Sequence, residues 1–294
     1  MDISSSRDLQ VLQGLLFLVI YLGALTGNLL TIAVIVTNPR LHSPMYFFIG
    51  NLSLIDLCSI SITVPKLIVN SLMGNKSISL TACAAQIFLF IFFGSTDFFF
   101  LVVMSYDRYV AICHPLHYGL IITPRMCTQA AGGSWASGLV YSAIHTSTMF
   151  RLPFTGSNVI HQYFCDIPQI LRIASSDVQY SEFVVLAISV CISIIGSALL
   201  FLSYINIFSM VLSMHSLEAR NKALSTCTPQ LAILLIFTTS GIIAALGPIA
   251  DKASLSNLLT GMFYTMVPPI INPLIYSLRN REINTALGRM FNRH

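Results

Sequence analysis

Long apolar runs separated by mostly short polar linkers make up the chain from residue 12 onward. Seven runs exceed the roughly 20 residues that an α-helix needs to cross a bilayer. Five of them contain no Asp, Glu, Lys or Arg. A backbone inside lipid must satisfy its own hydrogen bonds, so each run is expected to be helical. We predict an all-α membrane protein with seven transmembrane helices, at Leu12–Val36, Tyr46–Met73, Cys83–Ile112, Met126–Met149, Phe183–Met214, Ala223–Ala250 and Ala253–Leu278.

A shorter periodic segment follows the seventh run. Arg279–Phe291 places Ile283, Leu287 and Met290 at helical spacing, with charged residues between them. This pattern predicts an amphipathic helix on the inner membrane surface, and a frayed basic tail is the alternative. We therefore expect one domain over residues 1–294, with a tail at 1–11, helices over 12–278 and a cytoplasmic helix and tail at 279–294.

Composition supports a membrane protein and charge orients it. Of 294 residues, 55% are hydrophobic and 9% are charged, whereas soluble domains carry about 25% charged residues. With the amino terminus outside, nine basic residues fall on the inner side and six on the outer side, as the positive-inside rule requires. The net charge of +4 is then a topology signal, and it calls for no nucleic-acid partner.

An adjacent acid and base end the third apolar run. Asp107 and Arg108 lie within Met104–Cys113, which reads Met-Ser-Tyr-Asp-Arg-Tyr-Val-Ala-Ile-Cys. Such a pair is costly in hydrocarbon but tolerated at the lipid boundary. Alone, it could simply mark the end of a membrane helix.

The longer string is more specific. It resembles the cytoplasmic end of the third helix in olfactory receptors, a branch of the rhodopsin-like G-protein-coupled receptors. Leu41–Phe48, Arg220–Cys227 and Asn272–Asn280 resemble other segments of the same family, and the likeness covers nearly the whole chain. The resemblance implies a plasma-membrane odorant receptor with an extracellular amino terminus. It also implies coupling to a stimulatory heterotrimeric G protein, with no cofactor.

Several positions depart from the family pattern. Two cysteines common in the long outer loop are replaced within Leu152–Thr155 and Ala174–Ser176. Gln230 stands where a histidine is usual, and Thr238 replaces a tyrosine. Asp97 stands where glutamate is common.

Only Cys83 and Cys165 of the seven cysteines fall on the outer side. A lone pair in an oxidising compartment predicts a disulfide, here one that ties the third helix to the long outer loop. Asn75 begins the only outward-facing glycosylation sequon, which could equally be unused.

Polar residues in four helices suggest a shared interior network. They are Asn28, Asp56, Asp97 and Asn272. Buried polar groups in hydrocarbon need partners. Two interpretations stay open: a cation such as sodium lies between Asp56 and Asp97, or each carboxylate is protonated and hydrogen-bonded.

A ligand pocket is expected in the outer half of the bundle. At 1.5 Å per residue, its third-helix residues lie about 20–27 Å from Arg108. No charged group is among the candidates, which favours a small, mostly apolar neutral ligand; ordinary helix packing is the alternative for each. The candidates are Phe90, Ile91, Gly94, Ser95, Ile188, Ser189, Ile192, Gly241, Ile242, Ala245, Met262 and Thr265.

The boundary pair is the candidate switch. We expect Asp107 to neutralise Arg108 at rest, and Tyr204 and Tyr276 to receive Arg108 in the active state. The alternative is that Asp107 and Arg108 only set topology and folding.

Other function classes fit less well. A light receptor needs a seventh-helix lysine for retinal, and Ala253–Leu278 has none. An amine receptor needs an acid near Phe90, and none lies there. A transporter commonly shows an internal repeat, which the sequence lacks, and no nucleophile has an evident base and orienting partner, so we expect no enzyme.

Overall fold

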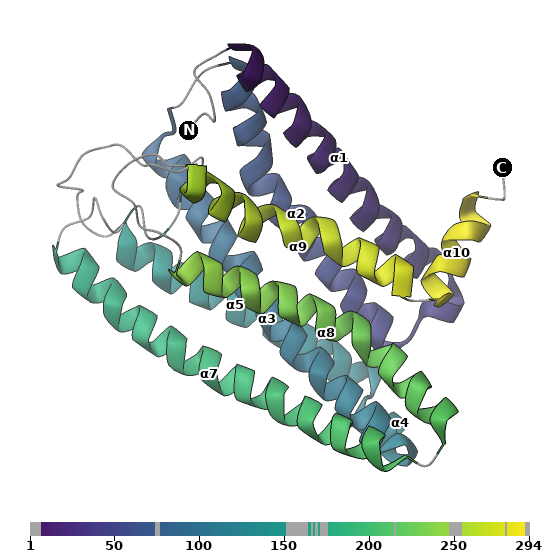
Figure 1. Ribbon diagram of the computed structural model, residues 1–294. Helices are drawn as coiled ribbons and strands as arrows, with labels where there is room; N and C mark the ends of the chain where they lie inside the picture. Colours follow the sequence, from purple (N-terminus) through teal and green to yellow (C-terminus); the bar gives the residue numbers. More distant parts are fainter. Residues whose placement is uncertain are drawn as a thin grey trace.

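A computed structural model describes residues 7–73, 77–150, 164–165, 167, 170, 176–214, 216–246, 255–279 and 281–291. These residues are helical apart from short connections, and none of them forms a strand (Figure 1). The helices, in chain order, are α1 (Arg7–Thr37), η1 (Pro39–Leu41), α2 (Pro44–Met73), α3 (Leu80–Cys113), η2 (Pro115–His117), α4 (Tyr118–Ile121), α5 (Pro124–Met149), α7 (Ser176–Ser213), α8 (Leu217–Leu246), α9 (Leu255–Arg279) and α10 (Arg281–Phe291).

Each predicted membrane helix corresponds to one long helix. The ends of α3 and α5 are set by local chemistry: the Ser79 hydroxyl accepts from the Ala82 N–H, and Thr123 caps α5 in the same way. The amino-terminal end is a correction, because α1 already begins at Arg7, inside the segment expected to be a tail. Arg7 donates there to the carbonyl of Leu72, which joins α1 to the outer end of α2.

Within the described residues, five helices are long and apolar enough to cross a membrane: α1, α2, α3, α7 and α8. The helix α5 falls outside this set because it carries many Ser, Thr and Gly residues. It nevertheless packs along α3 as part of the same bundle.

The helix α3 is the central element. It contacts α2, α5, α7 and α8, while α1 packs against α2 and α9. Figure 1 shows α10 turning away from the end of α9 on the α1 side of the bundle. A hydrogen bond of 2.6 Å from the Tyr46 hydroxyl to Glu282 ties α10 to α2. The structure thus has the seven-helix architecture and the short terminal helix that the sequence predicts.

Glycines set the closest helix contacts. A Cβ atom at Gly138 of α5 would collide with the Thr96 hydroxyl, and one at Gly196 of α7 would lie 2.5 Å from Phe98 Cζ. Both neighbours belong to α3, so a larger residue at either glycine would require the Thr96 or Phe98 side chain to move. The inner half is filled by a buried cluster that includes Phe48, Leu52 and Phe100.

Candidate ligand and switch sites

A cavity of about 200 Å³ lies between α2, α3, α8 and α9. Phe90, Phe93, Phe237 and Tyr264 give it aromatic walls. Its volume is below the roughly 300–1,000 Å³ of typical ligand pockets. It therefore suits a very small ligand.

Three of the candidate pocket residues line this cavity: Phe90, Gly94 and Thr265. A Cβ atom at Gly94 would meet nothing within 4 Å, so that glycine leaves room in the bundle. Thr265 is buried and donates to its own helix at the carbonyl of Gly261, at 2.7 Å. Met262 is partly buried one turn away, against the cluster around Phe164.

Other candidates among the described residues do not line this cavity. Ile91 packs into the cluster around the disulfide, and Ser95 donates to the carbonyls of Ile91 and Phe92 on its own helix. On α7, Ile188 and Ile192 are exposed on the outside of the bundle. The spacing of the three α7 candidates within little more than one helical turn could not show which face of α7 points into the bundle. The side chains of Gly241, Ile242 and Ala245 lie outside the described part of the structure.

Ser189 instead belongs to a polar cluster that the sequence analysis missed. His145 of α5 contacts the Glu182 carboxylate through Nδ1 and the Ser189 hydroxyl through Nε2, the latter at 3.0 Å. All three residues are buried, and Tyr141 packs on the His145 ring. Because Glu182 lies 37 residues from His145, only the pairing of α5 with α7 brings them together.

The cavity is also lined by two carboxyl groups, which were not among the candidate pocket residues. Asp56 and Asp97 both line it. Asp56 accepts a hydrogen bond of 2.9 Å from the Asn272 amide, whereas Asp97 Oδ1 has no partner among the described residues. Ser240 Oγ, also at the cavity wall, is likewise unpartnered within the described part.

The predicted polar network is only partly assembled. Asn28 donates to the backbone carbonyls of Ala24 and Pro269, at 3.0 and 2.9 Å, so it joins α1 to the broken backbone of α9. It does not hydrogen-bond to either carboxylate through this amide. Within the described residues, no group of three or more His, Cys, Asp or Glu side chains is arranged to hold a metal ion.

Asp107 and Arg108 form an ion pair at the inner end of α3, in which Nε of Arg108 donates to Oδ2 of Asp107 at 2.9 Å. The other carboxylate oxygen accepts a hydrogen bond of 2.7 Å from the Tyr118 hydroxyl of α4. Partial burial and this bond to Asp107 raise the pKa of Tyr118 well above its ordinary value of 10.0. The hydroxyl therefore remains a donor at neutral pH. Sequence spacing did not reveal Tyr118, which reaches Asp107 through the η2–α4 turn.

The two candidate partners of Arg108 are not engaged. Tyr204 and Tyr276 are buried, and neither hydroxyl has a hydrogen-bond partner among the described residues. Tyr204 packs instead with Ile207, Val211 and Cys227. The role of these four residues as a switch stays a prediction. The candidate glycosylation residue Asn75 lies outside the described residues.

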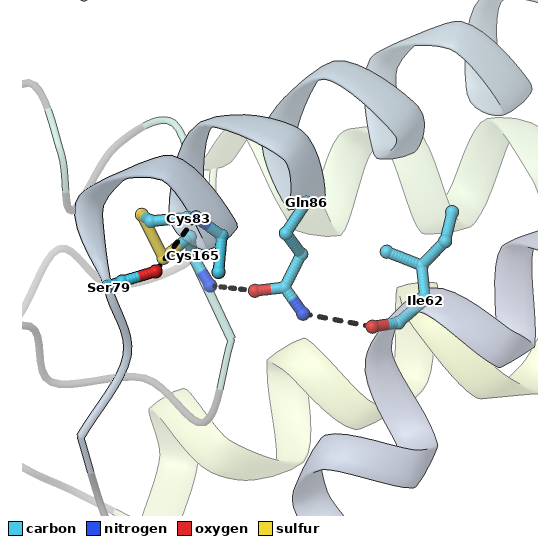
Figure 2. The surroundings of a disulfide bond; sticks show 6 residues. Ile62, Ser79, Cys83, Gln86 and Cys165 are labelled. Atoms are coloured by element: carbon cyan, nitrogen blue, oxygen red, sulfur yellow. Dashed lines mark hydrogen bonds between the residues drawn. A yellow bond between two sulfur atoms is a disulfide. The ribbon is translucent and has the colours of Figure 1, made fainter.

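The structure contains the predicted disulfide between Cys83 and Cys165, whose Cα atoms are 5.5 Å apart. Figure 2 shows how Gln86, one turn further along α3, supports it. Its Oε1 accepts from the Cys165 N–H at 2.9 Å, and its Nε2 donates to the Ile62 carbonyl at 3.0 Å. One buried amide therefore joins α2, α3 and the outer loop. Next to Cys165, Phe164 packs against Phe90 and Tyr264 over the cavity.

The fold is that of a seven-helix membrane bundle. Squid rhodopsin has a similar structure, with a TM-score of 0.73, 18% identity and coverage of 98% of this chain and 87% of that one; at this identity, the likeness concerns the fold.

A family model described as olfactory receptor matches residues 17–294. Human olfactory receptor 14I1 is 51% identical over 99% of this chain and 94% of that protein. Human olfactory receptor 14J1 is 46% identical over 100% of this chain and 91% of that protein. The chain belongs to the olfactory receptor family, and it is a multi-pass membrane receptor rather than an enzyme.

Proposed function

We propose that the cavity beside Gly94 is the odorant site and that its ligand is small, mostly apolar and neutral. The observation that carries the proposal is the open space at Gly94, inside a cavity with aromatic walls. Apolar burial against these rings supplies most of the affinity, because a pocket of this size can make few polar contacts.

Polar groups on one wall of the cavity orient the polar end of the ligand. Asp97 Oδ1 and Ser240 Oγ are buried acceptors without partners among the described residues, and an unpaired buried acceptor is energetically costly. A ligand hydroxyl that donates to either oxygen relieves this cost. Small alcohols should therefore be preferred over hydrocarbons of the same shape.

The response is passed to a stimulatory G protein at the inner face. This part of the proposal is supported by the family and by the Asp107–Arg108 pair, which lies about 16–27 Å along α3 from the cavity-lining residues of that helix. The receptor works in the plasma membrane with its amino terminus outside, and the charge distribution described above supports this orientation.

The test is a panel of small alcohols, aldehydes and hydrocarbons, with cyclic-nucleotide production measured in transfected cells. Gly94→Leu should remove or reorder the responses at unchanged surface expression, because the new side chain fills the cavity. Gly133→Leu is the matched control, since a Cβ there also meets nothing within 4 Å but the residue is exposed on α5. If both variants keep the parent's ligand ranking and potency, the cavity is not the odorant site.

A further inference from the structure

A second and larger cavity, of about 550 Å³, lies between the outer parts of α2 and α3. Ser61, Ile62 and Lys66 line it from α2, and Ala82, Ala85, Gln86 and Leu89 line it from α3. Ala82, Ala85 and Leu89 are exposed, so this groove opens toward the surroundings of the bundle rather than into the odorant cavity. A molecule would enter it sideways from the membrane.

Lys66 is a charged group with no counter-charge among the described residues. It lies inside the apolar span of α2, about 10 Å along the helix from its outer end at Met73. It makes no hydrogen bond or ion pair with any of the described residues, and it is only partly exposed. A cation at this depth is costly unless it is paired or reaches the lipid boundary. The groove therefore has a positive charge at one end and apolar side chains along its wall.

The groove also has fixed hydrogen-bonding groups on its wall. Ser79 caps α3, and the amide of Gln86 is held between the Ile62 carbonyl and the Cys165 N–H (Figure 2). Both the oxygen and the nitrogen of the Gln86 amide already have hydrogen-bond partners, so this side chain gives the wall a fixed shape. Lys66 is then the group in the groove that is available to pair with a ligand.

We propose that this groove binds a single-chain amphiphile with a carboxylate head, such as a fatty acid, from the outer leaflet. The carboxylate pairs with the Lys66 ammonium, and the chain lies along Ala82, Ala85 and Leu89. One cation matches one negative charge. The volume is within the range of small-molecule sites, and suits one acyl chain better than a two-chain phospholipid. The groove is separate from the odorant cavity, since the two share no lining residue.

The test uses the purified full-length receptor in nanodiscs of phosphatidylcholine, without odorant. Binding of radiolabelled oleate is compared with competition by oleyl alcohol, which keeps the chain and lacks the charge, and by phosphatidylglycerol, which is anionic with two chains. Oleate should bind saturably and at least about tenfold more tightly than either competitor. Oleyl alcohol loses the charge-assisted pair with Lys66, and the second chain of phosphatidylglycerol does not fit the groove.

Two variants sharpen the result. Lys66→Gln should weaken oleate binding about tenfold, while Lys66→Arg should retain it, because the charge is kept. Ala85→Trp should block binding by filling the groove, and Val140→Trp, on an exposed face of α5, is the matched control that should leave binding intact.

Equal affinity for oleate and oleyl alcohol would overturn the role of Lys66, and this comparison needs no variant. Tighter binding of phosphatidylglycerol would identify a phospholipid site and overturn the proposed occupant. Oleate binding that survives Ala85→Trp would place it elsewhere on the receptor. Since no odorant is present, these outcomes do not depend on the proposed odorant site.

Discussion

Two buried aspartates on α3 lie ten residues apart and have opposite surroundings. Asp107 accepts hydrogen bonds from Arg108 and Tyr118, so both of its oxygens are engaged. Asp97 faces the cavity, and its Oδ1 has no partner within the described residues. The same type of side chain therefore has all its hydrogen bonds made by protein groups at the inner end of α3, at Asp107, and an unpartnered oxygen in the middle of the helix, at Asp97.

The difference indicates what each site can do. A saturated carboxylate stabilises one arrangement of its neighbours, and changing it shifts the balance between arrangements. An open carboxylate pays a desolvation cost that a ligand, water or cation can relieve. We therefore expect changes at Asp107 to alter resting activity and changes at Asp97 to alter what binds.

Removing the positive charge of Arg108, the partner of Asp107, should have the largest effect on signalling. Arg108→Ala should eliminate signalling and leave odorant binding unchanged, because the cavity-lining residues of α3 are about 16–27 Å away. Surface labelling and ligand binding provide the controls. A variant that reaches the surface and still couples to the G protein would show that the pair only sets topology and folding.

Neutralising the acid at the same site should act in the opposite direction. Asp107→Asn keeps the size of the side chain but removes the counter-charge of Arg108. We expect ligand-independent signalling to rise about tenfold, which corresponds to roughly 1.4 kcal/mol between resting and active states. Cyclic-nucleotide production without odorant measures this effect. An unchanged basal level would mean that the ion pair does not favour the resting state.

The equivalent change at the open site should leave basal signalling nearly constant. Asp97→Asn should shift the potency of alcohol ligands about fivefold, because an amide replaces one acceptor oxygen by a donor, while hydrocarbon ligands keep their potency. Dose–response curves for matched alcohol and hydrocarbon pairs distinguish the two. If Asp97→Asn raises basal signalling as Asp107→Asn does, the comparison between the two aspartates fails.

The smallest expected effect is the loss of the Tyr118 hydrogen bond. Tyr118→Phe should reduce the free energy of unfolding by about 1 kcal/mol, since this residue is only partly buried. Its pKa is raised in the folded state. The contribution is therefore complete below the ordinary pKa of 10.0 and is lost as the pH rises above it toward the folded value. The free energies of unfolding of the parent and the variant should be measured from neutral to strongly alkaline pH. We expect the two values to become equal only at the alkaline end.

Much of the architecture could be predicted from hydrophobic length alone. The ends of α2 and α5 lie within two residues of their predicted positions, because apolar runs and capping residues act locally. The predicted starts of α7 and α8 are six or seven residues too late, since both helices continue into polar sequence beyond the apolar run. The disulfide followed from topology, because only two cysteines face outward.

The sites were harder to predict because they depend on helix rotation. Phe90 and Gly94, which were chosen from their spacing on α3, line the cavity, but on α7 spacing could not distinguish the face of Ser189 from that of Ile188. The buried pair of His145 and Glu182 joins α5 to α7 across the long outer loop, with the two residues 37 positions apart in the sequence, and nothing local to either residue indicates it. Tyr118 and Gln86 were missed for the same reason: each acts across a tertiary contact.

Gly94 on α3 and the two glycines that face α3, Gly138 and Gly196, should differ in how readily they tolerate substitution during evolution. At Gly138 and Gly196, an added Cβ would collide with the side chains of Thr96 and Phe98, so substitution there disturbs the packing of α5 and α7 on α3. At Gly94 the added atoms enter open space, so substitution can create a different chemical preference without loss of the scaffold. Duplicated copies of such a gene could then diverge in what they detect through positions like Gly94, while the helix crossings stay fixed.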